Sequence, residues 1–212
     1  MHPDPNFRIK GDEAQARMFM ENIIHEIGFG AIFMTTENGP RVAHVPFFYT
    51  KDGALQFHIS RGNALHNALC DAQKYGEALA VINGPDAYIS PNDYVDSALQ
   101  VGTWNYIALE LQGPVRKMAD EGLVALLDDL SDVHEEKSGQ NPKWTRDKMD
   151  ARQFEKMCRA ISGFEMEIKA WRPTIKLSQN KSAEERENIA QKLEARGQMA
   201  ISFMMRQNWS GE

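Results

Sequence analysis

The sequence predicts a protein of mixed α and β structure, mainly β, whose core is an antiparallel sheet or barrel. Three segments with strand-like patterns, 31–36, 41–50 and 55–60, follow one another with only turns between them. No region shows the regular strand–helix–strand rhythm of a parallel sheet, and no dinucleotide-binding glycine motif is present. We therefore expect consecutive strands to pair as an antiparallel meander.

The first third of the chain carries clear start and stop signals. Asp12 is expected to cap a helix that ends near residue 26, with Gly28 as its stop. Pro46 lies inside the second strand and is typical of an edge strand or a bulge, because proline has no N–H for the ladder. After the third strand, Asn63 is suited to cap a helix whose apolar spacing begins in 64–69.

The rest of the chain alternates strands, loops and amphipathic helices. Ser182 and Glu185 have the spacing of a capping box at the start of a C-terminal helix. The expected elements are strands 78–83 and 87–90 broken at 84–86, a loop at 91–103, strand 104–115, helices 120–136 and 151–160, strand 163–171, a polar extended stretch at 172–181, and helices 182–196 and 199–206.

Composition excludes several classes of protein. The 212 residues carry a formal net charge of −6, which argues against a general affinity for DNA or anionic membranes. No apolar run approaches the length of a membrane span, and the first ten residues lack the apolar core of a signal peptide. Cys70 and Cys158 have no metal-type spacing, so we expect reduced core thiols and a cytoplasmic protein.

The stretch 55–70 combines a strand, a polar turn and the start of a helix. Its turn contains Ser60, Arg61 and Asn63, which offer a hydroxyl, a cation and an amide as hydrogen-bond donors. A turn that leads into a helix start also directs backbone N–H groups to one point, an arrangement that suits a phosphate. The alternative is an ordinary strand-to-helix connection.

Two later segments are richer in hydrogen-bonding and aromatic side chains than a structural role requires. Segments 83–91 and 102–106 place two tyrosines, a tryptophan and an asparagine around turns, a composition that can wall a planar heteroaromatic ligand. The segment 176–180 has four hydrogen-bonding side chains without a helix or strand pattern. The alternatives are an aromatic cluster at the end of a barrel and a solvated linker.

Other site types find no support in the sequence. The six histidines lack metal-binding spacing, and neither a nucleophile elbow nor a phosphate-binding P-loop is present. Pairs of catalytic carboxylates are not recognisable, since the acidic residues mostly fall on the solvated faces of expected helices. A catalytic residue therefore cannot be assigned.

Together these motifs resemble one family. The motifs are HVPF at 44–47, HISRGN at 58–63, GPDAYISP at 84–91, TWNY at 103–106, GF at 163–164 and KLSQN at 176–180. In this order they resemble the PaiB-like, FMN-binding negative transcriptional regulators over about residues 1–195, and the combination of TWNY with KLSQN is the most specific feature. The chain departs from the family's usual residues at Ala64, His66, Asp93 and Gly102.

The resemblance implies a flavin split barrel, a six-stranded antiparallel Greek-key barrel that is dimeric and binds FMN in a groove between subunits. It implies that the 58–63 turn is the phosphate side and that the Trp104 and Lys176 segments wall the flavin or the adjoining groove. The implied FMN-binding residues are His58, Ser60, Arg61, Asn63, Tyr88, Ser90, Trp104, Asn105, Tyr106, Lys176, Ser178, Gln179 and Asn180.

Function follows from this resemblance as a set of alternatives. The first is a homodimeric FMN-binding negative transcriptional regulator or flavin-linked sensor, although no helix-turn-helix is visible and the net charge does not support DNA binding. The second is a flavin-dependent oxidoreductase acting on a small substrate, and the third is a haem-binding relative. We expect residues 1–181 to form the FMN-binding domain, with the N-terminal helix and a helical insertion, and 182–212 a helical extension.

Overall fold

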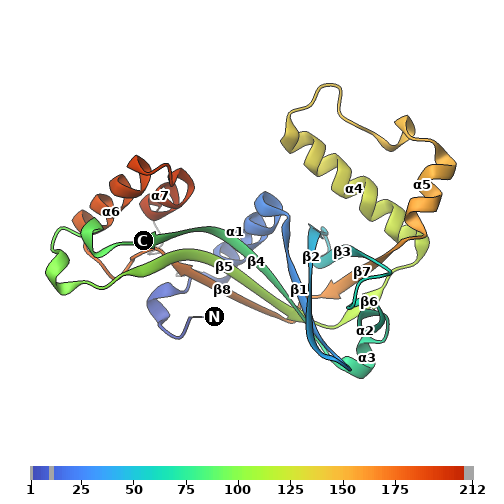
Figure 1. Cartoon of the computed structure of the whole chain (residues 1–212), viewed down its shortest axis with the longest axis horizontal. Helices are drawn as coiled ribbons and strands as arrows, with labels where there is room; N and C mark the ends of the chain where they lie inside the picture. Colours follow the sequence, from blue (N-terminus) through green and yellow to red (C-terminus); the bar gives the residue numbers. More distant parts are fainter. Residues whose placement is uncertain (1, 10–11, 208–212) are drawn as a thin grey trace. The chain divides into compact units, whose positions relative to one another are not determined.

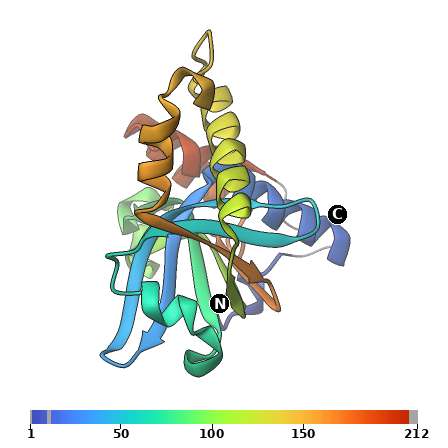
Figure 2. The same ribbon diagram turned by 90° about the vertical axis from the view of Figure 1, so that its right-hand side faces the viewer.

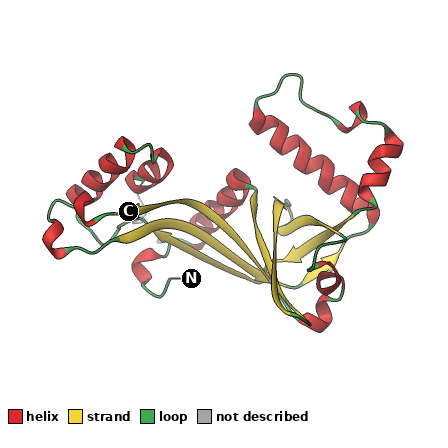
Figure 3. Ribbon diagram, in the orientation of Figure 1, coloured by secondary structure: helices red, strands yellow, loops and turns green. Residues whose placement is uncertain are grey.

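This computed structural model describes residues 2–9 and 12–207 of the chain. Strands supply most of the framework, and helices lie at the ends of the strands and along the chain between them (Figure 3). The strands are β1 (Phe29–Thr36), β2 (Gly39–Tyr49), β3 (Ala54–Ser60), β4 (Ala78–Ile89), β5 (Thr103–Gly113), β6 (Val115–Lys117), β7 (Ile161–Glu167) and β8 (Ala170–Lys176).

The α-helices are α1 (Glu13–Ile27), α2 (His66–Cys70), α3 (Ala72–Tyr75), α4 (Asp120–Ser138), α5 (Ala151–Cys158), α6 (Ala183–Ala195) and α7 (Met199–Arg206). Four 3₁₀ turns accompany them: η1 (Pro5–Phe7), η2 (Pro91–Asp93), η3 (Ser97–Leu99) and η4 (Arg146–Lys148). None of the helices within 2–9 and 12–207 is both long enough and apolar enough to cross a membrane.

The strands form one sheet in the order β6-β7-β3-β2-β1-β4-β5-β8 (Figure 1). β1 pairs antiparallel with β2 and β4, β2 with β3, and β7 with β3 and β6. The expected meander of the first three strands is therefore confirmed. The described chain has eight strands, so the expected number of six is wrong.

Two of the expected strands are each divided into two strands in the structure. The segment 104–115 forms β5 and β6, because Pro114 between them has no N–H for the ladder. Gly113 beside it lies so close to the Glu167 carbonyl that a Cβ on Gly113 would meet that oxygen at 1.8 Å. The segment expected as one strand over 163–171 is likewise divided into β7 and β8, and β8 continues into the stretch 172–181 that we expected to be extended.

Glycine and proline explain two further differences. β4 is continuous through 84–86. Gly84 allows close packing against Ile107, since a Cβ on residue 84 would lie 2.9 Å from the Ile107 Cβ. Pro46 does not make the whole of β2 an edge strand, but its own position has a pairing partner on one side only, Phe29 of β1, as expected for a residue without an N–H. β2 pairs with β1 up to Pro46 and with β3 from Phe47 onward, so the proline stands where the strand changes partner.

Contacts divide the chain into two compact units. Unit 1 contains Met1–Ile23, Asn83–Glu110 and Arg172–Glu212, and unit 2 contains Ile24–Ile82 and Leu111–Trp171. The division passes through α1, β4, β5 and β8, which contribute residues to both units.

Unit 2 has an aromatic core under its longest helix. The Phe57 and Phe164 rings stack with centroids 5.7 Å apart, and Phe47 meets Phe57 edge-on at 5.8 Å. α4 buries Leu123 and Leu126 toward this core and is followed by the α5 segment that leads back to β7 (Figure 2). Burial of such apolar surface is the main stabilising contribution of the unit.

Unit 1 buries the apolar faces of α6 and α7, which pack side by side. α7 begins and ends where the sequence predicted. Half of the expected capping box is present: the Ser182 hydroxyl accepts from the Glu185 N–H at 3.2 Å. The Glu185 carboxylate instead accepts from the Val95 N–H at 3.0 Å, so it ties the loop before β5 to α6.

The cysteines differ from expectation. Both Cys70 and Cys158 are free thiols, but Cys70 is exposed and Cys158 half-buried, so their expected place in the core is wrong. α2 is only five residues long, and this leaves Cys70 at its exposed end.

Candidate functional site

The turn after β3 lies in unit 2, and its backbone N–H groups are largely occupied. The Arg61 N–H donates to the Ala160 carbonyl at 2.9 Å, and the Asn63 N–H donates to the Ser60 carbonyl at 3.0 Å. The Gly62 N–H donates to the Ser60 hydroxyl at 3.2 Å. The expectation that backbone N–H groups of this turn are free for a phosphate is therefore wrong for these three.

Asn63 also has a different local role from the one expected. Its Oδ1 accepts from the Leu65 N–H at 2.9 Å and closes a turn, whereas Leu65 itself is the N-cap residue of α2. The reason is local geometry. An asparagine side-chain oxygen often accepts a hydrogen bond from the backbone N–H two residues later, and this closes a turn instead of capping a helix. A helix of five residues also contributes little dipole, so any anion here must be held by side chains.

The side-chain donors of the turn remain available. Ser60 and Asn63 use their oxygens as acceptors, which leaves the Ser60 hydroxyl hydrogen and the Asn63 amide hydrogens free to donate. The Arg61 Nε donates to the Ile161 carbonyl at 3.0 Å, and this contact anchors the side chain while its two terminal nitrogens have no ion pair within the described chain. Each of these three side chains therefore keeps a hydrogen-bond donor.

His58 precedes this turn on β3, opposite Gly163 of β7. Its Nδ1 is buried and lacks a hydrogen-bond partner among the described residues. Burial lowers the pKa of this imidazole, so the ring is neutral at pH 7. A neutral ring with an unused nitrogen can donate to or accept from a bound molecule.

Tyr88 and Trp104 form an exposed aromatic pair in unit 1. Their ring centroids are 6.1 Å apart at an interplanar angle of 63°, and the two side chains are 51% and 54% exposed. With Leu193 and Arg196 they line a cavity of about 430 Å³. Gly102 makes this arrangement possible, because a Cβ on residue 102 would lie 2.1 Å from the Tyr88 hydroxyl.

Neighbouring residues of β5 point to opposite faces. Trp104 and Tyr106 alternate with Asn105, which is buried. Trp104 and Asn105 accordingly line two different cavities, and Tyr106 is half-buried and lines neither of them. The TWNY motif thus faces two cavities rather than one.

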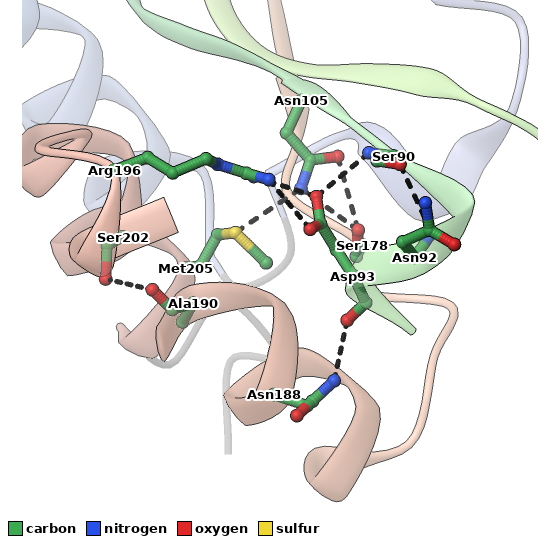
Figure 4. Close-up of polar contacts among 10 residues, drawn as sticks. All are labelled: Ser90, Asn92, Asp93, Asn105, Ser178, Asn188, Ala190, Arg196, Ser202 and Met205. Carbon is green, nitrogen blue, oxygen red and sulfur yellow. Dashed lines mark hydrogen bonds and ion pairs between the residues drawn. The ribbon is translucent and has the colours of Figure 1, made fainter. Parts of the chain in front are cut away.

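Asn105 reaches the KLSQN segment. Its amide nitrogen donates to the Ser178 hydroxyl at 3.0 Å, and that hydroxyl lies 3.2 Å from the Asn105 Oδ1 (Figure 4). The same amide nitrogen lies 3.4 Å from the Met205 sulfur of α7. The pairing of the two motifs therefore has a physical basis in a buried contact.

The KLSQN segment lies directly after β8 and is held by its own glutamine. The Gln179 side chain accepts from the Leu177 N–H at 2.8 Å and donates to the Ile175 carbonyl at 2.5 Å. This clamp supports Ser178 at a φ of 61°, a left-handed conformation that is uncommon outside glycine. The Gln179 amide is thus engaged locally, whereas Lys176, Ser178 and Asn180 line a cavity of about 350 Å³ together with Asn105.

Ser90 contributes to local structure as well. Its hydroxyl accepts from the Asn92 N–H at 3.2 Å, and its backbone N–H donates to the Asp93 carboxylate at 2.9 Å (Figure 4). Asp93 was not among the predicted site residues, yet it is a buried carboxylate that pairs with Arg196. The sequence signal was weak, since only its replacement of the family's usual aromatic residue singled it out.

Ten of the thirteen predicted residues thus lie in three places. His58 near the end of β3 and Ser60, Arg61 and Asn63 of the following turn lie together in unit 2. In unit 1, Tyr88 and Trp104 share one cavity, and another brings together Asn105, Lys176, Ser178 and Asn180. The second cavity is also lined by Thr103, the first residue of TWNY, and by Lys181, which directly follows KLSQN; neither was among the predicted site residues.

Comparison with known proteins follows the same motifs. Residues 1–170 match the family model described as "Putative FMN-binding domain", which spans well over half of the chain. The chain belongs to this FMN-binding family. FMN is accordingly its cofactor, and the PaiB-like resemblance of the motifs is confirmed.

Individual relatives are distant. The chain is 26% identical over 176 residues to the Bacillus subtilis protein named "Protease synthase and sporulation protein PAI 2", with 82% of each chain covered. The FAD- and haem-binding protein of Mycobacterium smegmatis has a TM-score of 0.57 at 18% identity, covering 80% of this chain and 76% of the other. The flavocytochrome Anf3 of Azotobacter vinelandii has a TM-score of 0.55 at 15% identity, covering 82% and 72%.

The structural similarity supports the fold. A mainly β, antiparallel sheet with peripheral helices is shared with these flavin-binding proteins, and the split-barrel class of fold is confirmed at that level. The donor chemistry of the 60–63 turn also fits the FMN-binding family, because a hydroxyl, an amide and a guanidinium can all donate to phosphate oxygens.

Proposed function

We propose that this protein is a homodimeric FMN-binding regulator or flavin-linked sensor of the PaiB-like kind, in which the 60–63 turn holds the FMN phosphate. The observation that carries the proposal is the Arg61 side chain. It is anchored at Nε by the Ile161 carbonyl and keeps its terminal nitrogens without an ion pair within the described residues. An anchored guanidinium loses little further entropy when it binds a phosphate.

Neighbouring side chains complete the proposed phosphate site. The Ser60 hydroxyl and the Asn63 amide stand on either side of Arg61 in the chain and keep donor hydrogens, as their oxygens are engaged. His58 lies at the β3 end of the same turn with its neutral imidazole. FMN supplies reversible electron or hydride transfer when bound. The role of these residues is to bind and orient the cofactor.

Other parts of the predicted set support ring binding. Tyr88 and Trp104 offer two exposed aromatic faces beside a cavity, and a flavin ring is a planar partner for such faces. Within this proposal residues 1–181 make up the FMN-binding domain and 182–212 a helical extension.

The proposed dimer is supported by an apolar face in unit 2. Phe29 and Phe33 lie on the same side of β1 with the small Ala31 between them, and Val42 is the direct partner of Phe33 on β2. All three are exposed. Adjacent exposed apolar side chains of this size mark interaction surfaces, and a second copy of the chain would cover them.

A flavin-dependent oxidoreductase is the alternative function, with haem binding as a further possibility. The neutral His58 at the start of the proposed phosphate site favours an enzyme, since an imidazole whose pKa is lowered by burial keeps a free base form at pH 7 that can accept a proton. Reduction of the bound flavin by NADPH with turnover would establish the enzyme. Protection of a specific DNA segment would establish the regulator, and the absorbance spectrum of the purified protein separates flavin from haem.

The phosphate assignment is tested with Arg61→Ala. A charge-assisted contact contributes about 1.5–3 kcal/mol, so FMN affinity should fall about tenfold or more. Riboflavin, which lacks the phosphate, should bind nearly as before. Arg41→Ala, an exposed arginine of β2 in the same unit, is the matched control. Equal losses for FMN and riboflavin would show that Arg61 has a structural role and would overturn the assignment.

A further inference from the structure

A second cavity, distinct from the 60–63 turn, has the chemistry of an anion site. This lysine cavity, of about 350 Å³ in unit 1, is lined by Lys176 and Lys181 together with residues of the N-terminal segment, the loop before β5 and the start of β5. Both lysines are half-buried. Two cations that line one cavity attract a counter-ion.

The hydrogen-bond partners of these lysines carry no charge. The Lys176 Nζ donates to the Thr103 hydroxyl at 2.6 Å, and the Lys181 Nζ donates to the Gln100 side-chain oxygen at 2.8 Å. Neither ammonium has a carboxylate within 4.0 Å among residues 2–9 and 12–207. Each ammonium has three hydrogens, so each keeps donors for a ligand. Two positive charges thus line one cavity, and no described carboxylate lies within ion-pair distance of either.

One carboxylate, Asp4, does line the lysine cavity, but it is engaged elsewhere. Its Oδ1 accepts from the Asn6 N–H at 2.9 Å and caps η1. The Asp4 N–H donates to the His2 Nδ1 at 3.1 Å, and the His2 N–H donates to the Thr174 hydroxyl at 3.0 Å. Asp4 therefore shapes the N-terminal wall, and the lysines remain unpaired.

Aromatic and aliphatic side chains supply the apolar part of the lysine cavity. The Lys176 Nζ lies 5.8 Å from the centre of the Phe7 ring, and the Lys181 Nζ lies 5.2 Å from that of Tyr94. Such cation–π contacts fix where the ammonium groups stand. Leu99 and Val101, which are 83% and 80% exposed, add an apolar rim that the fold does not explain.

We propose that the lysine cavity binds a small organic anion with a flat apolar body, a carboxylate or a phosphate ester, through Lys176 and Lys181. The two ammonium groups would donate hydrogen bonds to the anionic oxygens of the ligand. The Phe7 and Tyr94 rings and the apolar rim would contact its flat apolar body. This site is additional to FMN binding and involves none of the side-chain donors of the 60–63 turn. An effector or a substrate of the flavoprotein could occupy it.

The test is calorimetric titration of the full-length, FMN-loaded protein with three probes of similar shape: benzoate, phenyl phosphate and benzamide. Benzoate or phenyl phosphate should bind and the neutral benzamide should not, and the tighter of the two anions identifies the class of anionic group. Binding should weaken as salt is raised. No binding of either anion, or equal binding of benzamide, would overturn the proposal.

Variants assign the binding to the lysines. Lys181→Met and Lys176→Met should each weaken anion binding roughly tenfold, the loss expected for one charge-assisted contact. Lys192→Met, an exposed lysine of α6 in the same unit, should leave it unchanged. Unchanged binding in both cavity variants would overturn the proposal. The proposal would also be overturned if FMN displaced benzoate from the cofactor-free protein. The lysine cavity would then be the site that binds the FMN phosphate.

Discussion

Arg196 and Asp93 form a two-pronged ion pair, in which each terminal guanidinium nitrogen lies 2.8 Å from one carboxylate oxygen (Figure 4). Asp93 is 2% exposed, and the Asn188 side chain also donates to its backbone carbonyl at 2.7 Å. Burial alone would raise the pKa of Asp93, but the hydrogen bonds from Arg196 and the Ser90 N–H outweigh it and lower the pKa. The pair joins η2 to the C-terminal end of α6.

Removing the cation should therefore be costly. Arg196→Met leaves a buried carboxylate without its partner, so we expect the unfolding free energy at pH 7 to fall by about 1.5–3 kcal/mol. This loss is smaller than that for a fully buried ion pair, because Arg196 is partly exposed. Urea unfolding measures it. Arg159→Met removes an exposed i,i+4 pair with Glu155 and should cost about 0.5 kcal/mol or less.

Lowering the pH should reduce the difference in stability between wild type and Arg196→Met. A carboxylate whose folded pKa is lowered stabilises the protein above its unfolded pKa, near 3.8, and that contribution disappears as pH falls through the lowered folded value. Wild type and Arg196→Met should thus converge in stability below about pH 3.8. A difference that stays constant between pH 7 and pH 3 would show that the arginine acts by packing alone.

Gly102 is expected to be indispensable for the aromatic pair. Gly102→Ala would place a Cβ 2.1 Å from the Tyr88 hydroxyl, so the ring must move away from Trp104, at a cost of about 1–3 kcal/mol. Thermal unfolding and tryptophan fluorescence should both change. Gly122→Ala inside α4 meets only the flexible Met118 side chain and should be neutral or slightly stabilising. Equal behaviour of the two variants would contradict the packing role.

Local patterns predicted the elements well, whereas part of their division depended on tertiary contacts. The α7 bounds and the first three strands followed from periodicity and turn residues. Pro114 marks the break between β5 and β6 in the sequence itself, whereas the continuity of β4 depends on Ile107 packing against Gly84. Such approaches between distant segments leave no mark on local propensity.

The candidate site shows the same limit. The sequence identified the turn donors and the KLSQN segment, because polar residues without a structural pattern are noticeable. It could not show that Gln179 is used as a clamp, that Asn105 is buried against Ser178, or that Lys181 completes a cavity. These features depend on which hydrogen-bond partners the folded chain offers to each backbone and side-chain group.

Trp104 is predicted to contribute to flavin binding. Offset stacking contributes about 0.5–1.5 kcal/mol beyond burial, so Trp104→Ala should weaken FMN and riboflavin about two- to tenfold alike. Stability should change little because the side chain is 54% exposed. Trp144→Ala, at 40% exposure in the other unit, serves as the control in the same fluorescence titration. Unchanged flavin affinity would exclude Trp104 from the site.

The apolar face of β1 and β2 is predicted to form the dimer contact. Phe33→Glu places a charge beside Val42, and a charge buried in an apolar interface without a partner is strongly unfavourable. Sedimentation should show the wild type as a dimer at micromolar concentration and the variant as a monomer. Phe203→Glu, on the exposed side of α7, should remain dimeric. A monomeric wild type that binds FMN would refute the dimer.

The last prediction separates the two roles of Asn63. Its Oδ1 holds the Leu65 N–H, whereas its amide hydrogens are the groups available to a phosphate. Asn63→Asp keeps an oxygen for the Leu65 N–H but removes the donor and adds a negative charge. Stability should change little, while FMN affinity should fall about tenfold or more and riboflavin affinity should not, since riboflavin carries no phosphate to repel.

Asn63→Ala provides the comparison, because it removes both roles. It should weaken FMN binding less than Asn63→Asp, as no repulsion is introduced, yet it should lower the unfolding free energy by about 1 kcal/mol through loss of the turn contact. The order of FMN affinity is therefore wild type, Ala, Asp, and the order of stability is wild type, Asp, Ala. If FMN affinity instead followed stability, Asn63 would act only by shaping the turn, and the phosphate would be bound elsewhere.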